Sequence, residues 1–65
     1  MSSLDRTQVS AVRSQVSELA ERVAAVAERL SEGPTTDASS ALFEAERSLR
    51  MAERALDRAH GALDG

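Results

Sequence analysis

The sequence predicts an all-α fold, an antiparallel hairpin of two long helices. Three observations support this prediction: each half of the chain carries a heptad repeat of apolar residues, one helix-breaking segment separates the halves, and the two repeats are nearly equal in length. We expect one domain over residues 1–65, with helices at about 3–32 and 38–62 and a turn at about 33–37.

In the first half of the chain, apolar residues recur at alternating steps of three and four, which is typical of a helix with one narrow buried stripe. In heptad notation the residues at position a are Val9, Val16, Val23 and Leu30, and those at position d are Val12, Leu19 and Val26. β-Branched valine lowers intrinsic helix propensity, so this helix is expected to depend on packing against a partner helix.

The predicted turn combines the usual stop and start signals of helices. Gly33 stands where a left-handed C-cap is favoured, and Pro34 cannot continue the helix. Candidate N-caps for the second helix follow at Thr35, Thr36 and Asp37. The chain is therefore expected to reverse direction here.

The second half repeats the pattern with alternating residue sizes, which resembles an antiparallel alanine coiled coil. Leucines hold position a at Leu42, Leu49, Leu56 and Leu63, and alanines hold position d at Ala38, Ala45, Ala52 and Ala59. Folding at Pro34 places Leu19 opposite Leu49 near the middle of the hairpin. A slip of one heptad is the alternative register, but it leaves Leu42 unpaired and needs a longer loop.

Small residues flank the predicted a/d contact on both sides. On one side long polar residues of the first helix face small residues of the second, namely Gln8, Gln15, Arg22 and Arg29 over Ala62, Ala55, Ser48 and Ala41. On the other side Ala20 and Ala27 are expected to face Glu53 and Glu46. These small-residue stripes leave room for another partner.

The second helix has a wider apolar arc than one partner helix requires. The predicted interaction residues are Ala41, Ser48, Met51, Ala55 and Ala62, together with Phe43. Because 65 residues without cysteine make a thin core, a second copy is expected to cover this arc and form a homodimeric four-helix bundle. Phe43, the sole aromatic residue, has two open interpretations: it caps the turn, or it projects as an anchor for another protein.

Catalysis and metal binding are not expected. The chain has no cysteine and one histidine, which excludes thiol nucleophiles, disulfides and thiolate zinc sites. His60 is interpreted as a cation near the end of the second helix. We therefore predict a protein that is not an enzyme, with no catalytic, cofactor-binding or metal-binding residues and no cofactor.

Charge also limits the expected partners. The net charge is −3, and the arginines of the second helix, Arg47, Arg50, Arg54 and Arg58, alternate with acidic residues, so neither nucleic acid nor membrane is expected as a partner. All eight basic residues are arginine, which is typical of GC-rich bacterial genomes. No signal peptide or span of about 20 apolar residues is visible, so a cytoplasmic location is expected.

Two functions of different classes fit these features. The first is a self-associating interaction or scaffolding module, and the alternative is a small regulatory inhibitor, of the antitoxin or anti-activator type, that binds a helix of a target protein. A nucleic-acid-binding protein that uses the arginine face is a more distant third. A small helical hairpin resembles the secreted WXG100 proteins, which also dimerise through paired helices. The chain has no tryptophan, its turn reads Glu32-Gly33-Pro34 and it is shorter than that family's usual span, so no family is assigned.

Overall fold

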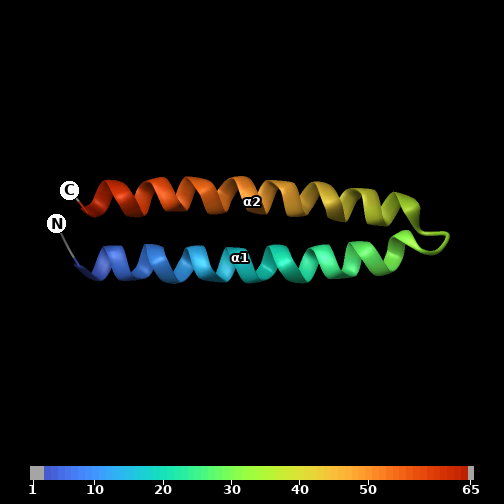
Figure 1. Ribbon diagram of the computed structural model, residues 1–65, viewed down its shortest axis with the longest axis horizontal. Coiled ribbons are helices and arrows are strands. Elements are labelled where there is room, and N and C mark those ends of the chain that lie inside the picture. Colours follow the sequence, from blue (N-terminus) through green and yellow to red (C-terminus); the bar gives the residue numbers. More distant parts are fainter. Residues whose placement is uncertain (1–2, 65) are drawn as a thin grey trace.

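The structure, a computed structural model that describes residues 3–64, is an antiparallel hairpin of two helices (Figure 1). Helix α1 spans Ser3–Ser31 and helix α2 spans Thr36–Asp64, each with 29 residues. The hairpin is 51 Å long and 14 by 9 Å across, measured on the Cα atoms. The all-α hairpin prediction is confirmed, and α2 begins and ends two residues outside the predicted range of 38–62.

The turn is closed by hydrogen bonds to one carbonyl at the end of α1. The Leu30 carbonyl accepts the Gly33 amide at 3.4 Å and the Thr35 hydroxyl at 3.1 Å. Gly33 does not adopt a positive φ, so the predicted left-handed C-cap is wrong. Because the Thr35 hydroxyl also donates a hydrogen bond to the Leu30 carbonyl, this helix end needs no left-handed residue. Thr35 also opens α2, because its carbonyl accepts the Ser39 amide at 3.1 Å.

The contact between the helices follows heptad positions a and e. The a positions of both helices are half-buried. Ala20 and Ala27, at position e of α1, are 0% exposed, and Ser39, at position e of α2, is 4% exposed. The d positions largely face solvent: Val12 and Leu19 are 44% and 45% exposed. All four alanines at position d of α2 are exposed as well, namely Ala38, Ala45, Ala52 and Ala59.

The predicted a/d contact therefore differs from the one that the hairpin makes. Relative to it, each helix is turned by about 50° around its own axis, because successive residues are about 100° apart. The physical reason lies at Ala20 and Ala27, whose small side chains let the backbone of α2 approach closely along position e. On the Ala20 and Ala27 side of α1, the space that the sequence suggested for another partner is therefore filled by α2.

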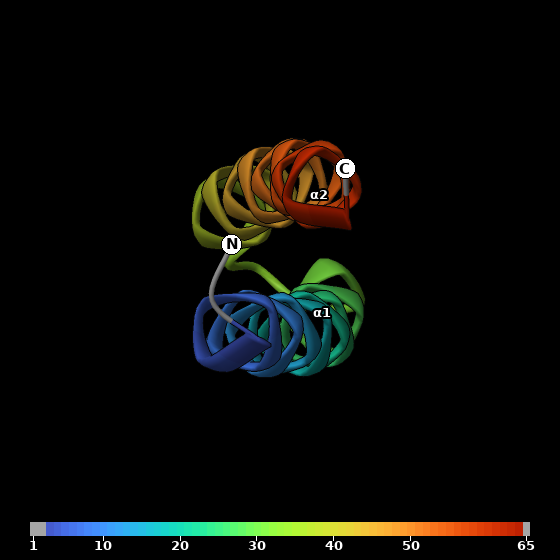
Figure 2. The ribbon, with the colours of Figure 1, turned by 90° about the vertical axis from the view of Figure 1, so that its left-hand side faces the viewer.

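The rotation separates the surface of the hairpin into two different faces. Because the helices run in opposite directions, the same rotation brings both d rows to one side of the plane that contains the two axes. In the end view of Figure 2, α2 lies above α1, so this plane is vertical and the two faces lie to its left and right.

Within residues 3–64, neither helix is long and apolar enough to cross a membrane.

Candidate interaction surface

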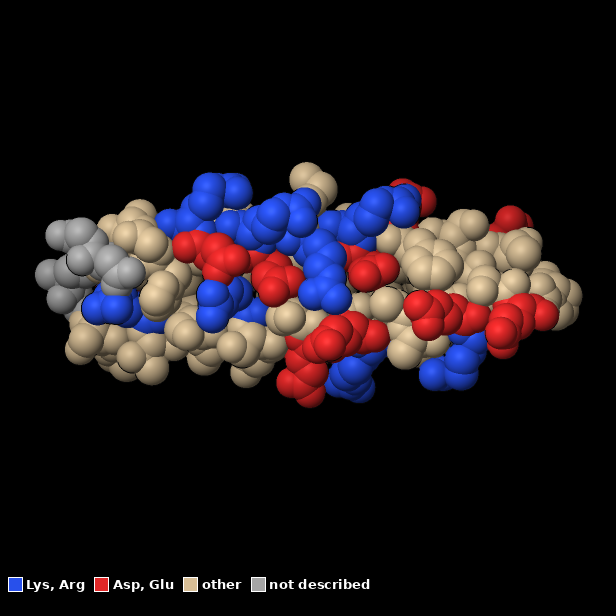
Figure 3. Space-filling view, viewed as in Figure 1, with Lys and Arg blue, Asp and Glu red and all other residues tan. Residues whose placement is uncertain are grey.

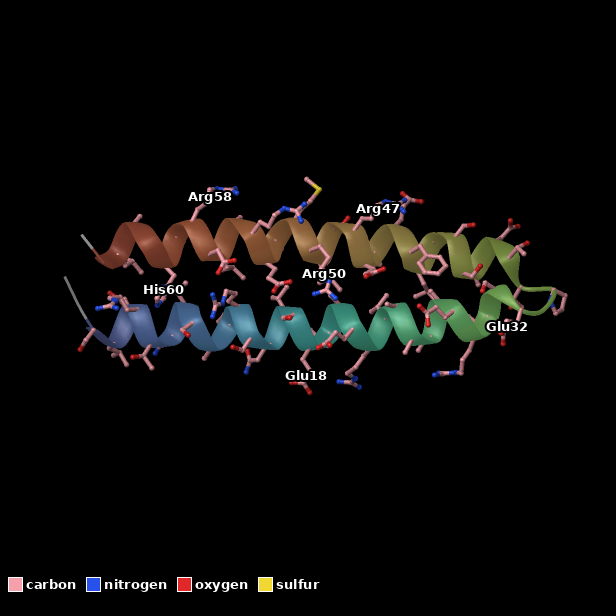
Figure 4. All side chains as sticks on the ribbon, viewed as in Figure 1. Glu18, Glu32, Arg47, Arg50, Arg58 and His60 are labelled. Carbon is pink, nitrogen blue, oxygen red and sulfur yellow. The ribbon has the colours of Figure 1, made fainter. Side chains whose placement is uncertain are left out.

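Charged residues cover one of the two faces, which Figure 3 shows. We call this the polar face, and it comprises Arg13, Glu46, Arg50, Glu53 and Asp57. Arg50 lies between two carboxylates of its own helix, with Nε 3.7 Å from Glu46 and Nη1 3.1 Å from Glu53. Its side chain points toward α1 in Figure 4. Arg50 thus supports α2 locally through ion pairs at i,i+4 and i,i+3 spacing.

Arg13 joins the two helices across the polar face by donating a hydrogen bond to the Asp57 carboxylate. This hydrogen bond, with the negative charge of Asp57, raises the pKa of Arg13 above its ordinary value. The two side chains are 39% and 51% exposed, so water screens their attraction. The ion pair orients the helices more than it stabilises them.

The outer side of α2 carries arginines without an ion pair. Among the described residues, no ion pair is formed by Arg47, Arg54 or Arg58. Arg47 and Arg58 point away from α1 in Figure 4. The acidic residues that alternate with the arginines along α2 therefore leave these three without an ion pair.

The opposite face is apolar. We define the apolar face by the exposed or half-buried d residues of both helices, namely Val12, Leu19 and Val26 of α1 with Ala38, Ala45, Ala52 and Ala59 of α2. It contains an open hollow of about 240 Å³, lined by Leu19, Arg22, Val23, Val26 and Leu42. The hollow draws its lining from both helices, and Arg22 is its only charged residue. This face can accept apolar side chains of a partner.

Four of the predicted interaction residues lie on α2 beside the apolar face, whereas Met51 lies on the outer side of α2 with Arg47 and Arg54. Ala41, Ser48, Met51, Ala55 and Ala62 are all exposed, and Met51 is 63% exposed. Four of them occupy heptad position g, next to the d row, and so they widen the apolar face on the α2 side. Phe43 is separated from them: it is half-buried and shares a heptad row with Arg50 and Asp57 of the polar face.

The sequence interpretation missed the α1 half of this surface. Val12 and Leu19 were assigned to the contact within the hairpin, whereas the structure leaves almost half of each side chain exposed. The signal that identifies them is the pair Ala20 and Ala27, because two alanines one heptad apart permit closer helix packing than the valine and leucine at position d. Apolar periodicity alone does not distinguish which of two neighbouring rows is covered.

A second, more polar hollow lies at the open end of the hairpin. Half-buried His60 points toward α1 there (Figure 4) and lines the hollow with Ser3, Arg6, Thr7, Ser10, Ala11 and Ser14. Among residues 3–64 no group of three histidines, cysteines or carboxylates is placed to hold a metal ion. His60 is thus placed between the helices, where it contributes to their packing.

Comparison with known proteins adds no relative to this description. No protein-family model, no curated protein and no solved structure matches the chain.

Proposed function

We propose that the protein is a self-associating helical hairpin, an interaction or scaffolding module whose apolar face is covered by a second copy to give a four-helix bundle. The main support for this proposal is that the apolar repeat of the sequence and the contact within the hairpin use different heptad positions. Apolar residues repeat at positions a and d, but the hairpin covers positions a and e. In a four-helix bundle each helix buries a wider stripe, so the uncovered d row is what a second hairpin would cover.

The surface area of the hairpin supports the proposal. Its accessible surface is 4568 Å², whereas a compact monomer of its mass exposes about 4,000 Å². Among the described residues the buried apolar side chains are Ala20 and Ala27, and no large side chain is fully buried. A single hairpin therefore covers little of its own apolar surface, and association is the available way to cover more.

The dimensions of the hairpin also suit a dimer. A face 51 Å long and 14 Å wide has a projected area of about 700 Å², which is near the roughly 800 Å² that each partner buries in a stable protein interface. Ala41, Ser48, Ala55 and Ala62 extend the apolar face at its α2 edge. They are the part of the predicted interaction surface that a second copy would contact.

Thermal unfolding at several protein concentrations tests the proposal. If folding and association are linked, the melting temperature rises with protein concentration. Ala52→Glu should abolish this dependence, because Ala52 is exposed in the hairpin and lies on the apolar face. Ala25→Glu is the matched control, since Ala25 is exposed on the outer side of α1. A melting temperature that is independent of concentration in the unmodified protein contradicts the proposal.

The alternative function is a regulatory inhibitor whose apolar face binds a helix of a target protein. The hollow between Leu19 and Leu42 favours this alternative, because it is open and can receive one large side chain from a helix laid along the face. A folded monomer that is unaffected by Ala52→Glu would support the inhibitor over self-association. In that case the same substitution should prevent capture of the target.

A further inference from the structure

We infer that the second copy lies with its turn at the same end of the bundle, so that α1 of each chain packs against α2 of the other. This inference rests on the proposed self-association and specifies its symmetry. Two hairpins can cover each other's apolar faces around a two-fold axis in two ways: an axis parallel to the helices places both turns together, and an axis perpendicular to them places the turns at opposite ends.

We call the position of a residue along the long axis of the hairpin its height. Contacts within one chain show which residues of α1 and α2 have the same height. Leu42 lines the same hollow as Val23 and Val26, and Arg13 reaches Asp57 farther from the turn. An axis parallel to the helices leaves every residue at its own height. Residues of α1 therefore meet residues of the second copy's α2 at the heights that already pair within the hairpin.

At these heights the large d residues of α1 fall between small residues of the second copy. Leu19 lies between Ala45 and Ala52 of the second copy, and Val12 lies between its Ala52 and Ala59. Val26 lies in the same way between alanines nearer to the turn. Large side chains that insert between small ones give dense packing at equal helix spacing on both sides of the bundle.

The rim of the apolar face has complementary charges in this arrangement. Arg22, which lines the hollow, lies at the height of Glu44 of the second copy, and Arg29 lies near its Asp37. Among the described residues, none of these four side chains forms an ion pair within its own chain. To reach these acids, the long side chains of Arg22 and Arg29 would lie over the small residues Ser48 and Ala41 of the second copy. This agrees with the sequence pattern, in which long polar residues of α1 face small residues of α2.

The arrangement with opposed turns packs less evenly. It places α1 on α1, with valine and leucine facing each other, and α2 on α2, with alanine facing alanine, so the two contacts need different helix spacings. It also offers opposite charges, Glu44 with Arg58 and Arg29 with Asp5, so charge alone does not separate the two arrangements. The pairing of large with small residues favours turns at the same end.

A distance between the two turns tests the inference directly. The chain has no cysteine, so Glu32→Cys creates one attachment site for a spin label at the exposed turn (Figure 4). With turns at the same end, double electron–electron resonance should give a distance within about 25 Å, because neighbouring helix axes are 8–10 Å apart. A distance near the hairpin length of 51 Å would overturn the inference while preserving self-association. A monomer with no dipolar coupling would overturn both.

A charge exchange provides a second, independent test. Arg22→Glu and Glu44→Arg should each weaken dimerisation by about tenfold, since each replaces two symmetry-related attractions by repulsions. The double variant should restore the dimer, because the pair is re-formed with reversed charges. Glu18→Arg is the control for added positive charge, as Glu18 points away from α2 (Figure 4). Additive weakening in the double variant would contradict the proposed arrangement.

Discussion

Arg13 of α1 and Asp57 of α2, 44 positions apart in the chain, form an ion pair that bridges the two helices on the polar face. The pair fits the register that places Leu19 near Leu49. A slip of one heptad would separate the two side chains by about 10 Å, the rise of seven helical residues. The contact therefore distinguishes the predicted register from the slipped one, although both bury leucine and valine.

Arg13→Gln is expected to lower the melting temperature by only a few degrees, because both partners are well exposed. The raised pKa of Arg13 means that the guanidinium stays charged through neutral and mildly alkaline pH. Its contribution is therefore present there and is lost only as the pH rises through the pKa of the folded state. The unmodified protein and the variant should thus differ equally at pH 7 and pH 9. Thermal melting followed by circular dichroism measures this difference, and a difference that disappears at pH 9 would contradict the assignment.

Ala20→Leu is expected to destabilise the fold by about 1–3 kcal/mol, since Ala20 is fully buried in the contact between the helices. The a/d contact expected from the sequence makes the opposite prediction, because it leaves Ala20 on a flank with room for a larger side chain. Chemical denaturation measures the change, with Ala25→Leu on the exposed side of α1 as the control. Equal stability of the two variants would refute the a/e contact.

Leu49→Asp is expected to unfold the hairpin. Leu49 is half-buried at the middle of the helix contact, where a carboxylate finds no partner. Arg54→Glu changes the charge by two units on the exposed side of α2 and should leave the helical content unchanged. Far-ultraviolet circular dichroism compares the two variants. Native helical content in the Leu49→Asp variant would show that position a does not form the contact.

Gly61→Ala is expected to stabilise the protein by about 0.5–1 kcal/mol, because alanine favours the helix and a Cβ at this position meets no atom within 4 Å. Gly33→Ala should also be tolerated, since Gly33 has no positive φ and its surroundings are open. The sequence-based expectation of a left-handed C-cap predicts a clear loss of stability instead. Denaturation midpoints of both variants decide between the two.

Much of the fold was predictable from sequence, because it depends on strong local signals. Gly33 and Pro34 mark the turn, and the leucine and valine rows at position a identify the inner side of each helix. The choice between positions d and e was not predictable from apolar periodicity. It depends on how closely two backbones approach at Ala20 and Ala27, which is a property of the packed pair. The α1 half of the candidate surface was missed for the same reason.

Sedimentation equilibrium of the unmodified protein at tens of micromolar tests most directly whether the apolar face joins two copies. We predict a mass of twice the 6.9 kDa chain, falling toward one chain on dilution. The Ala52→Glu variant should sediment as a single chain under the same conditions. A folded single chain of 6.9 kDa for the unmodified protein at every concentration would contradict self-association and leave the apolar face to a different partner.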